Sequence, residues 1–475
     1  MTKGITKRSE DYSQWYIDVV LKADMADYAP VDGCMVIKPN GYGVWEKMQQ
    51  ALDVRFKETG HVNAYFPMLI PERIHEQEAG HAAGLTAECA VVTQGGGKTL
   101  DEPLVIRPSS EAIIWSCYKN WINTHHDLPV LINQWANMCR WEMRTRLFLR
   151  TTEFLWQEGH TAHATYEDAE AETLRMVHVY QQFAEEFMAM PVITGRKTDR
   201  EKSAGALHSY CVEGLMQDGK VLQAGAAHNL GQNIAKAFDV TFQDDDKQVK
   251  HVYGARWAVS TRLICAMVMT HSDDNGLVLP PRLAPRPVAI VPSYNNGEER
   301  AKVLAKAREI TRSWAPAFFC IDDREQHDSA FKSREWEMKG VPVRIEIGPG
   351  DADNNSVVAV RRDTGDRTTL FNQGLRERLR AMLEDIQQNL YNAARRRLEV
   401  HTHTIDDFGD YKGRVGKGGL FRVFLDHENP EVEERLWADT KSRVCCIPFD
   451  APDETGFCMI TGKRCKGRVI AARAY

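Results

Sequence analysis

The 475-residue sequence has no long hydrophobic run. No apolar stretch approaches the roughly 18–20 residues that a membrane-spanning helix needs, which excludes a bilayer-spanning α-helical protein and argues against a membrane partner. The first fifteen residues lack the apolar core of a secretion signal, so we expect a cytoplasmic protein. Net charge is small, −6 from 60 basic and 66 acidic residues. Such a balance argues against a protein that coats nucleic acid with a generally basic surface.

Dense cysteine spacing and complete metal or nucleotide motifs are also missing. The eleven cysteines are scattered, which excludes a disulfide scaffold and favours reduced thiols. The four C-terminal cysteines contain no C-x2-C pair, so we expect no metal ligands among the site residues. Gly95-Gly96-Gly97-Lys98-Thr99 lacks the first glycine of a P-loop, and His75-Glu76 with His81 lacks the H-E-x-x-H spacing.

The composition that is present, 43% hydrophobic and 27% charged, is typical of a folded protein with about two to four domains. Four prolines between residues 280 and 287 predict a stiff linker. We therefore expect domains at residues 1–283, 284–390 and 391–475. The first domain shows strands separated by irregular charged loops, which indicates a mainly antiparallel sheet with helices packed on it, an α+β fold. The second alternates strands and helices and is predicted to be α/β.

Individual elements follow from hydrophobic periodicity and turn residues. In the first domain we expect a turn at residues 40–43, helices at 45–57 and 167–190, a helix beginning at Arg262, and strands at 62–70, 131–135 and 154–157. In the second domain we expect strands at 288–291, 317–321, 341–347 and 357–361, and helices at 298–315 and 331–339. A charged helix at 374–397 and a small third unit follow.

Three clusters could carry chemistry. Arg140 and Glu142 stand two apart and would share one face of a strand, where the arginine binds a phosphate or carboxylate and the glutamate accepts from an amine. With the basic loop that follows, they predict a cradle for a nucleotide triphosphate, although surface ion pairs have the same pattern. Arg262 at a helix start needs an anionic partner or solvent. Arg107-Pro108-Ser109-Ser110-Glu111 is a kinked loop that fits a helix N-cap or a ligand site.

In combination and order, these motifs resemble those of class II aminoacyl-tRNA synthetases, specifically the prolyl-tRNA synthetase family in its short form shared by archaea, eukaryotes and some bacteria. Residues 41–71 resemble motif 1, residues 107–111 the R-P-T-S-E loop, residues 140–160 motif 2 and residues 259–281 motif 3. The resemblance implies an antiparallel class II catalytic domain, an α/β anticodon-binding domain and a small C-terminal α+β domain.

The resemblance also implies an activity, that of an aminoacyl-tRNA ligase. Proline would be activated with ATP, accompanied by Mg²⁺, to an aminoacyl-adenylate and then transferred to tRNA(Pro), and the enzyme would be a homodimer. Positioning and charge stabilisation would carry the catalysis. Local cationic contacts, with Arg361 and Arg362 as candidates for phosphate binding, would be enough for one folded RNA despite the negative net charge.

Site residues carried over by position fall into three groups. Arg140 and Arg262 are the implied catalytic residues. The implied ATP-binding residues are Arg140, Glu142, Arg150, Thr151, Phe154, Gln223 and Arg262. The implied amino-acid-binding residues are Leu85, Ser109, Glu111, Trp156, Glu158, His160, Ser203, His228, Arg256 and Ala258. Glu111 would take the cyclic ammonium group of the substrate.

Several amino-acid positions depart from the family pattern, whereas the nucleotide positions mostly follow it. Leu85 lies in Gly84-Leu85-Thr86-Ala87-Glu88 where the family has G-F-A-P-E, and Ser109 replaces a threonine. Ser203 stands in place of the phenylalanine of K-F-A-G-A, Gly225-Ala226-Ala227-His228 replaces G-T-S-H, and Arg256-Trp257-Ala258 replaces S-W-G. An inward Arg256 would favour an acidic or carbonyl-bearing side chain, and an outward one would pair with a surface acid.

Other functions therefore stay open at the level of sequence. One is a divergent paralogue that activates another amino acid or an analogue, for tRNA or another acceptor. A second is a duplicate that tolerates an inhibitor of the pocket. A third is a catalytically silent tRNA-binding protein, which the ATP-cradle residues Arg140, Glu142 and Arg262 argue against.

Overall fold

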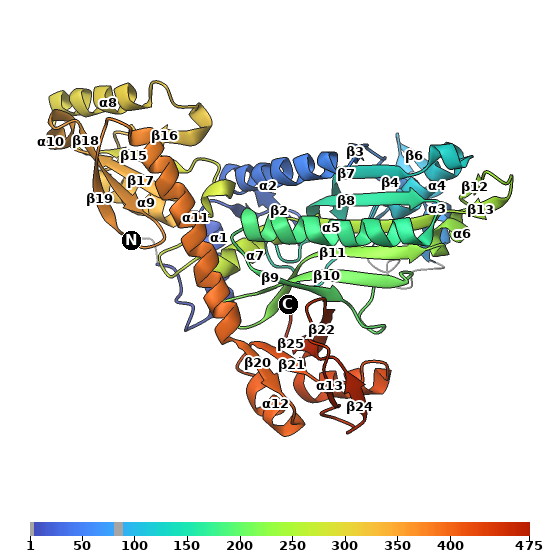
Figure 1. Cartoon of the computed structure of the whole chain (residues 1–475). Helices are drawn as coiled ribbons and strands as arrows, with labels where there is room; N and C mark the ends of the chain where they lie inside the picture. Colours follow the sequence, from blue (N-terminus) through green and yellow to red (C-terminus); the bar gives the residue numbers. More distant parts are fainter. Residues whose placement is uncertain (1–3, 80–88) are drawn as a thin grey trace.

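The computed structural model describes residues 4–79 and 89–475 and has three parts (Figure 1). Among the described residues the largest sheet has eleven strands, in the order β20-β21-β25-β22-β9-β10-β11-β14-β8-β7-β3. Its central strands are antiparallel, and helices pack against them. The predicted α+β fold with a mainly antiparallel sheet in the first part, a second α/β part and a small C-terminal part is confirmed.

The centre of the large sheet positions the site. It consists of β7 (Val130–Cys139), β8 (Glu153–His163), β14 (Tyr253–Ser260), β11 (Val221–Gly231), β10 (His208–Leu215) and β9 (Val192–Arg196), with the short β3 (Val62–Asn63) parallel to β7 at the edge. Helix α5 (Tyr166–Glu186) covers one face. Tyr180 of α5 donates to Gln157 of β8 at 2.5 Å, which assigns the odd-numbered positions of this part of β8 to the α5 face. Since side chains alternate along a strand, the even-numbered positions face the other way.

Three helices complete the core of the first part. Helix α7 (Arg262–His271) is buried on nearly all sides, as expected for a helix without a polar stripe, and α1 (Tyr12–Lys22) and α2 (Pro39–Glu58) pack against it. Smaller elements surround the sheet: β1 (Ala26–Tyr28), β2 (Met35–Ile37), β4 (Leu69–Pro71), α3 (Glu72–Ala79), β5 (Val91–Gly95), β6 (Lys98–Ile106), α4 (Glu111–Trp121), η2 (His125–Asp127), α6 (Asn233–Phe238), β12 (Thr241–Gln243), β13 (Val249–His251) and η3 (Pro281–Leu283).

The second part is an α/β unit whose sheet has the order β16 (Phe319–Ile321), β15 (Val288–Pro292), β17 (Val343–Ile347), β18 (Ser356–Arg361), β19 (Arg367–Phe371). Helices α8 (Gly297–Thr311), η4 (Pro316–Phe318), α9 (Ser329–Met338) and α10 (Pro349–Asp353) connect these strands. β15 is parallel to both β16 and β17, which confirms the strand–helix alternation expected from the sequence.

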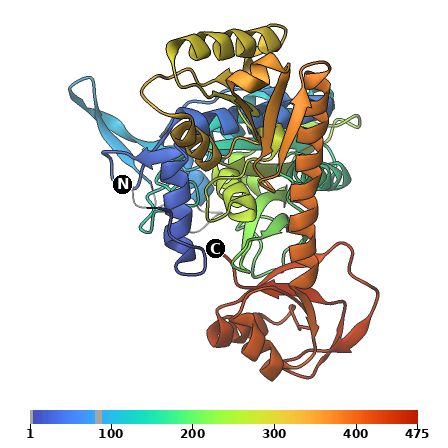
Figure 2. The ribbon, with the colours of Figure 1, turned by 90° about the vertical axis from the view of Figure 1, so that its left-hand side faces the viewer.

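Helix α11 (Leu375–Val400) joins the second part to the third, and Figure 2 shows it as a long rod between them. It runs without a break through residue 390, the expected domain limit, and Leu375, Leu383 and Leu390 pack in the core of the α/β unit. The third part contains β20 (Thr402–Ile405), α12 (Phe408–Val415), β21 (Leu420–Val423), α13 (Pro430–Thr440), β22 (Arg443–Pro448), β23 (Thr455–Phe457), β24 (Arg464–Lys466) and β25 (Val469–Ala472). Pairing of β22 with β9 makes its sheet continuous with the catalytic sheet.

Two local predictions for residues 40–70 are wrong. The expected turn at residues 40–43 is the first turn of α2, which Pro39 opens. Gly41 is needed there because a Cβ would lie 2.1 Å from the carbonyl oxygen of Met25, so the glycine permits close packing rather than a turn. The expected strand over residues 62–70 is instead two short strands, β3 and β4, which join different sheets.

In the part of the chain that the structure describes, no helix combines the length and apolar composition required to cross a membrane.

Candidate active site

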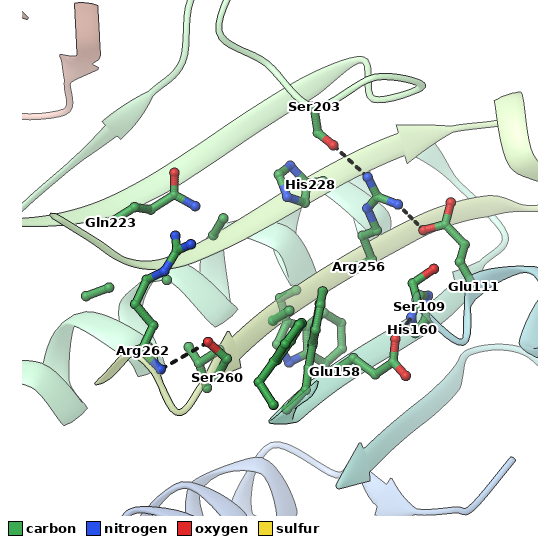
Figure 3. A pocket seen from close by; sticks show the side chains of 18 of the residues that line it. Ser109, Glu111, Glu158, His160, Ser203, Gln223, His228, Arg256, Ser260 and Arg262 are labelled. Atoms are coloured by element: carbon green, nitrogen blue, oxygen red, sulfur yellow. Dashed lines mark hydrogen bonds and ion pairs between the residues drawn. The ribbon is translucent and has the colours of Figure 1, made fainter. Parts of the chain in front are cut away.

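A cavity of about 410 Å³ opens on the even-numbered face of β8 and β14, opposite α5 (Figure 3). β8, β11 and β14 form its base, and the segments around Ser109, Arg140, Ser203 and Arg262 form its walls. Thirteen of the residues that the sequence assigns to the site line this one cavity: Ser109, Glu111, Arg140, Phe154, Trp156, Glu158, His160, Ser203, Gln223, His228, Arg256, Ala258 and Arg262.

Strand alternation explains the contribution of β8. Phe154, Trp156, Glu158 and His160 are two apart and therefore point to one face. The rings of Phe154 and Trp156 stack with centroids 5.4 Å apart, and Trp156 Nε1 is buried without a hydrogen-bond partner in the described part of the chain. These side chains provide a flat aromatic surface beside a carboxylate.

Arg140 stands at the aromatic side of the cavity. Its Nε donates to the carbonyl oxygen of Pro108 at 2.9 Å. Its guanidinium lies 4.6 Å from the centre of the Trp156 ring and 5.7 Å from that of Phe154. A hydrogen bond to a carbonyl and contacts with ring faces hold the guanidinium at the cavity lining.

Arg262 provides a second cation at the end of the cavity where Gln223 also lies (Figure 3). As predicted, it is the first residue of α7, and its Nε donates to the carbonyl oxygen of Leu149 at 3.2 Å. Burial, and next the neighbouring charge of Arg150, lower the pKa of the Arg262 guanidinium. Because this pKa starts far above neutral, the group stays charged, and a bound anion would relieve its desolvation.

Glu111 and Arg256 meet at the opposite end of the cavity. Glu111 begins α4, and a guanidinium nitrogen of Arg256 makes a short ion pair with its Oε2. The other terminal nitrogen of Arg256 donates to Ser203 Oγ at 2.6 Å. Of the two orientations that the sequence left open for Arg256, the structure has the inward one (Figure 3).

Glu158 is a second carboxylate at this end, and it is tied into a buried network. Gln134 donates to Glu158 Oε1 at 3.0 Å, the Ser110 N–H donates to Oε2 at 3.3 Å, and His160 Nε2 lies 3.0 Å from Oε2. Burial alone would raise the pKa of Glu158, but the interactions with His160, which contribute most, and the hydrogen bonds from Ser110 hold it below its usual value. Glu158 is therefore a fixed carboxylate.

His228 forms part of the wall between the two ends. Its Nδ1 lies 2.8 Å from Ser209 Oγ, which also accepts the N–H of Ser203 at 2.9 Å. Burial, followed by the charges of Arg256 and Lys197, pushes the pKa of His228 well below its usual value. The imidazole is therefore neutral and links the Ser203 segment to β11.

Three predicted ATP residues are absent from the cavity lining. Glu142 and Arg150 lie in the irregular segment between β7 and β8 and approach each other at 4.0 Å, and Thr151 donates to the carbonyl oxygen of Glu153 at 2.7 Å. The expected strand over Arg140 and Glu142 is wrong, because β7 ends at Cys139 and the Arg140 N–H bonds to Thr152 across the loop. Leu85 lies outside the described residues.

Sequence reasoning missed the support that Gln134 gives to the lining, and it singled out the cluster that contains Arg107 without assigning this supporting role to it. Gln134 is fully buried, accepts the Phe66 N–H at 2.5 Å, and donates to Ser110 Oγ at 2.8 Å as well as to Glu158. Arg107 is also fully buried and donates to the Phe66 carbonyl at 2.8 Å. The available signal was a polar side chain inside an apolar strand, since buried polar groups are hydrogen-bonded.

The arginines considered for RNA contact have intramolecular partners. Arg362 makes a two-pronged ion pair with Asp273 at 2.7 and 2.8 Å, which joins the α/β part to the end of α7. Arg361 pairs with Asp363 at 2.8 Å and with Asp385. The Arg362 pair joins two parts of the molecule, and the Arg361 pairs lie within the α/β part and its helix α11.

The described residues also bear on metal binding. Across residues 4–79 and 89–475 the structure gathers no group of three or more His, Cys, Asp or Glu side chains suited to a metal ion. A divalent cation in this cavity would therefore depend on its ligand for most of its coordination.

The sequence is similar to known proteins along its whole length. Residues 95–271 match the family model of the tRNA synthetase class II core domain (G, H, P, S and T), and residues 288–382 match the anticodon binding domain. The chain is 52% identical to a proline–tRNA ligase of Phocaeicola vulgatus over 492 residues, which cover all of this chain and 99% of the relative. Proline–tRNA ligases of Chlorobium phaeovibrioides and of a Roseiflexus species are also 52% identical, over all of this chain and 100% and 99% of the relatives.

Proposed function

Because the chain belongs to the proline–tRNA ligase family of class II aminoacyl-tRNA synthetases, we propose that it activates proline with ATP and transfers the prolyl group to tRNA(Pro). The observation that carries this proposal is the cavity itself, which has cations and aromatic rings at one end and the carboxylates Glu111 and Glu158 at the other. A nucleotide triphosphate needs cations for its phosphates and an aromatic surface for its base, and the ammonium group of an amino acid needs a carboxylate.

The first step follows from these charges. The proline carboxylate attacks the α-phosphorus of ATP, a C–O–P bond forms, and pyrophosphate leaves with the electron pair of the broken P–O bond. Arg140, at the aromatic side of the cavity, neutralises the carboxylate and the α-phosphate as they approach, and Arg262 binds the leaving phosphates. Phe154 stacks on the adenine. The chain supplies no nucleophile, so catalysis is positioning and charge stabilisation.

The amino-acid end holds the pyrrolidine. Glu111 accepts from the ring ammonium, and Trp156 and His160 line the ring. Ser109 Oγ and His160 Nδ1 are buried with no hydrogen-bond partner among the described residues. A buried polar atom without a partner costs free energy, and a polar substrate would relieve that cost.

Mg²⁺ fits this site as a companion of ATP. The described residues provide several cations but no carboxylate cage, so the ion would be held chiefly by phosphate oxygens and water, as Mg²⁺ prefers near octahedral coordination with few protein ligands. When bound, it would neutralise charge on the phosphates.

The second step transfers the prolyl group to the 3′ end of the tRNA. A terminal ribose hydroxyl attacks the carbonyl carbon of the adenylate, and AMP leaves. The α/β part, which matches the anticodon binding domain model, would hold the anticodon stem at a distance from the cavity.

Pyrophosphate exchange across all twenty amino acids tests the first step. The proposal predicts that proline gives the highest exchange rate, and a higher rate with another amino acid would contradict it. Charging of tRNA(Pro) with labelled proline tests the second step. Exchange with proline but no charging would limit the proposal to adenylate formation.

We also propose a cytoplasmic homodimer. Residues 41–71 expose several apolar side chains, among them Val54, Val62, Tyr65 and Leu69, as a surface that pairs with a second copy would. Light scattering during gel filtration tests this, and a mass near the 53.9 kDa of one chain would contradict the dimer.

A further inference from the structure

The ion pair between Arg256 and Glu111 occupies the group that, under the proposed function, binds the ammonium of proline. Resting on that function, we propose that Arg256 is a specificity-determining residue: it acts as an internal counter-ion that competes with the substrate ammonium for Glu111 and thereby weakens the binding of proline. This inference concerns residues of this chain, whose Arg256-Trp257-Ala258 differs from the family pattern.

The geometry holds Arg256 in the competing position. It projects from β14 into the cavity, where it makes an ion pair with the carboxylate of Glu111 and donates to Ser203 Oγ at 2.6 Å. The side chains are 19% and 5% exposed for Arg256 and Glu111, so water screens their attraction only weakly. Arg256 is also paired across the sheet with His160 and His228, which both line the cavity.

The charges at this end leave Glu111 as the relevant acceptor. Glu158 already receives hydrogen bonds from Gln134 and Ser110 and contacts His160. Glu111 has Arg256 as its charged partner. An incoming ammonium must therefore share or displace the guanidinium, and its attraction to Glu111 is partly cancelled by repulsion from Arg256.

Ser203 makes this arrangement possible. A small hydroxyl at this position accepts from Arg256 and leaves room for the guanidinium, and its own N–H is fixed by Ser209. A phenylalanine here would fill the same space and offer no acceptor. The hydrogen bond from Arg256 to Ser203 thus positions the guanidinium that competes for Glu111.

Two consequences separate competition from a merely structural role. Removal of the guanidinium should strengthen proline binding, whereas loss of a supporting residue would weaken it. In addition, the ammonium charge of proline should contribute less to binding in the natural chain than in a chain without Arg256. Tetrahydrofuran-2-carboxylate, which has a ring oxygen in place of the ammonium, measures that contribution directly.

The test uses the full-length protein with Ser, Gln and Lys in turn at position 256, and steady-state pyrophosphate exchange as the readout. R256S and R256Q are expected to lower the KM for proline about tenfold, the size of a charge-assisted hydrogen bond, with the KM for ATP unchanged. R256K keeps the charge and should stay near the natural KM. R395S, which removes an arginine from an exposed pair on α11, is the matched control and should change nothing.

Inhibition by tetrahydrofuran-2-carboxylate supplies the second readout. The ratio of its inhibition constant to the KM for proline should rise about tenfold in R256S and R256Q. An unchanged or higher KM for proline in both neutral variants, with their melting temperatures preserved, would overturn the inference while the proposed function stands. No proline exchange in any variant, with ATP still bound, would overturn the proposed function and the inference together.

Discussion

The two ends of the cavity hold their arginines by different means. At the nucleotide end, Arg140 and Arg262 are positioned by hydrogen bonds to the backbone carbonyls of Pro108 and Leu149. At the amino-acid end, Arg256 is positioned by the carboxylate of Glu111. A carbonyl acceptor orients a guanidinium without adding a negative charge, whereas a carboxylate offsets the charge of the guanidinium. The first arrangement attracts an anion, and the second reduces attraction for a cation.

The largest effect should come from the nucleotide end. R140A removes the cation that lies between carboxylate and α-phosphate, and the rate of proline-dependent exchange should fall by roughly 10²–10³-fold, as for loss of one transition-state donor. Initial-rate measurements at saturating ATP and proline check this. R395A on α11 is the control of equal chemistry. A loss of less than about tenfold would contradict the proposal that Arg140, at the nucleotide end, stabilises charge in the reaction.

The network beneath the amino-acid end should give the next largest effect. Q134L removes donors to Glu158 and Ser110, leaving a buried carboxylate short of a hydrogen bond. The free energy of unfolding should fall by about 1–3 kcal/mol, and the KM for proline should rise more than the KM for ATP. Urea denaturation and exchange kinetics measure these quantities.

The exposed Gln388 on α11 offers a matched control, because Q388L changes the same side chain at the surface. Equal loss of stability in Q134L and Q388L would mean that the buried network does not support the amino-acid end.

Stacking at the nucleotide end should be separable from proline binding. F154A removes a ring that faces the cavity and stacks on Trp156, so the KM for ATP should rise about tenfold through loss of one base–aromatic contact. The KM for proline should stay within about twofold. Exchange measured against each substrate in turn checks the prediction, and an equal rise in both KM values would contradict a division of the cavity into two ends.

The smallest effect concerns pH and the support of the Ser203 segment. Thr198 donates to Glu433 of α13 at 3.1 Å, and burial raises the pKa of Glu433 to about 7. The unfolded carboxyl titrates near 4.5, so between these pH values the folded chain binds one proton more than the unfolded chain and stability falls as pH rises. E433Q should therefore melt higher than the natural chain at pH 8.

That difference in melting temperature should shrink steadily as the pH falls from 8 toward 5, because the unfolded carboxyl, which titrates near 4.5, becomes increasingly protonated while the folded one already carries its proton. Scanning calorimetry from pH 5 to 8 measures it. A difference that does not depend on pH would mean that Glu433 is ionised in the folded chain.

Much of the cavity could be predicted from sequence because its parts are local. The resemblance to the family assigned Phe154, Trp156 and Glu158 to the site, strand alternation explains why they share one face, and the loop from Ser109 to Glu111 does lead into a helix. The segment containing Arg140 and Glu142 could not be predicted in the same way. Its conformation depends on a backbone hydrogen bond between Arg140 and Thr152 that closes a loop, and hydrophobic pattern contains no information on such a contact.

The direction of Arg256 could not be predicted for a related reason. Alternation says that Arg256 and Ala258 share a face of β14 but not which face meets α5 and which meets the cavity. That assignment depends on packing across the sheet, where Gly159 must be a glycine because a Cβ there would lie 2.1 Å from the Trp257 ring. Trp257 thus occupies the α5 side, and Arg256 is left to point into the cavity.

A crystal structure with a non-hydrolysable prolyl-adenylate analogue would show directly whether the substrate binds across both ends of the cavity and whether its ammonium competes with Arg256 for Glu111. We predict that the adenine stacks on Phe154, that the linkage replacing the phosphate contacts Arg140, and that the pyrrolidine nitrogen contacts Glu111 with Arg256 displaced from it or sharing it. An analogue bound with its pyrrolidine nitrogen away from Glu111 and the Arg256–Glu111 pair unchanged would contradict both the role of Glu111 as the ammonium acceptor and the competition by Arg256.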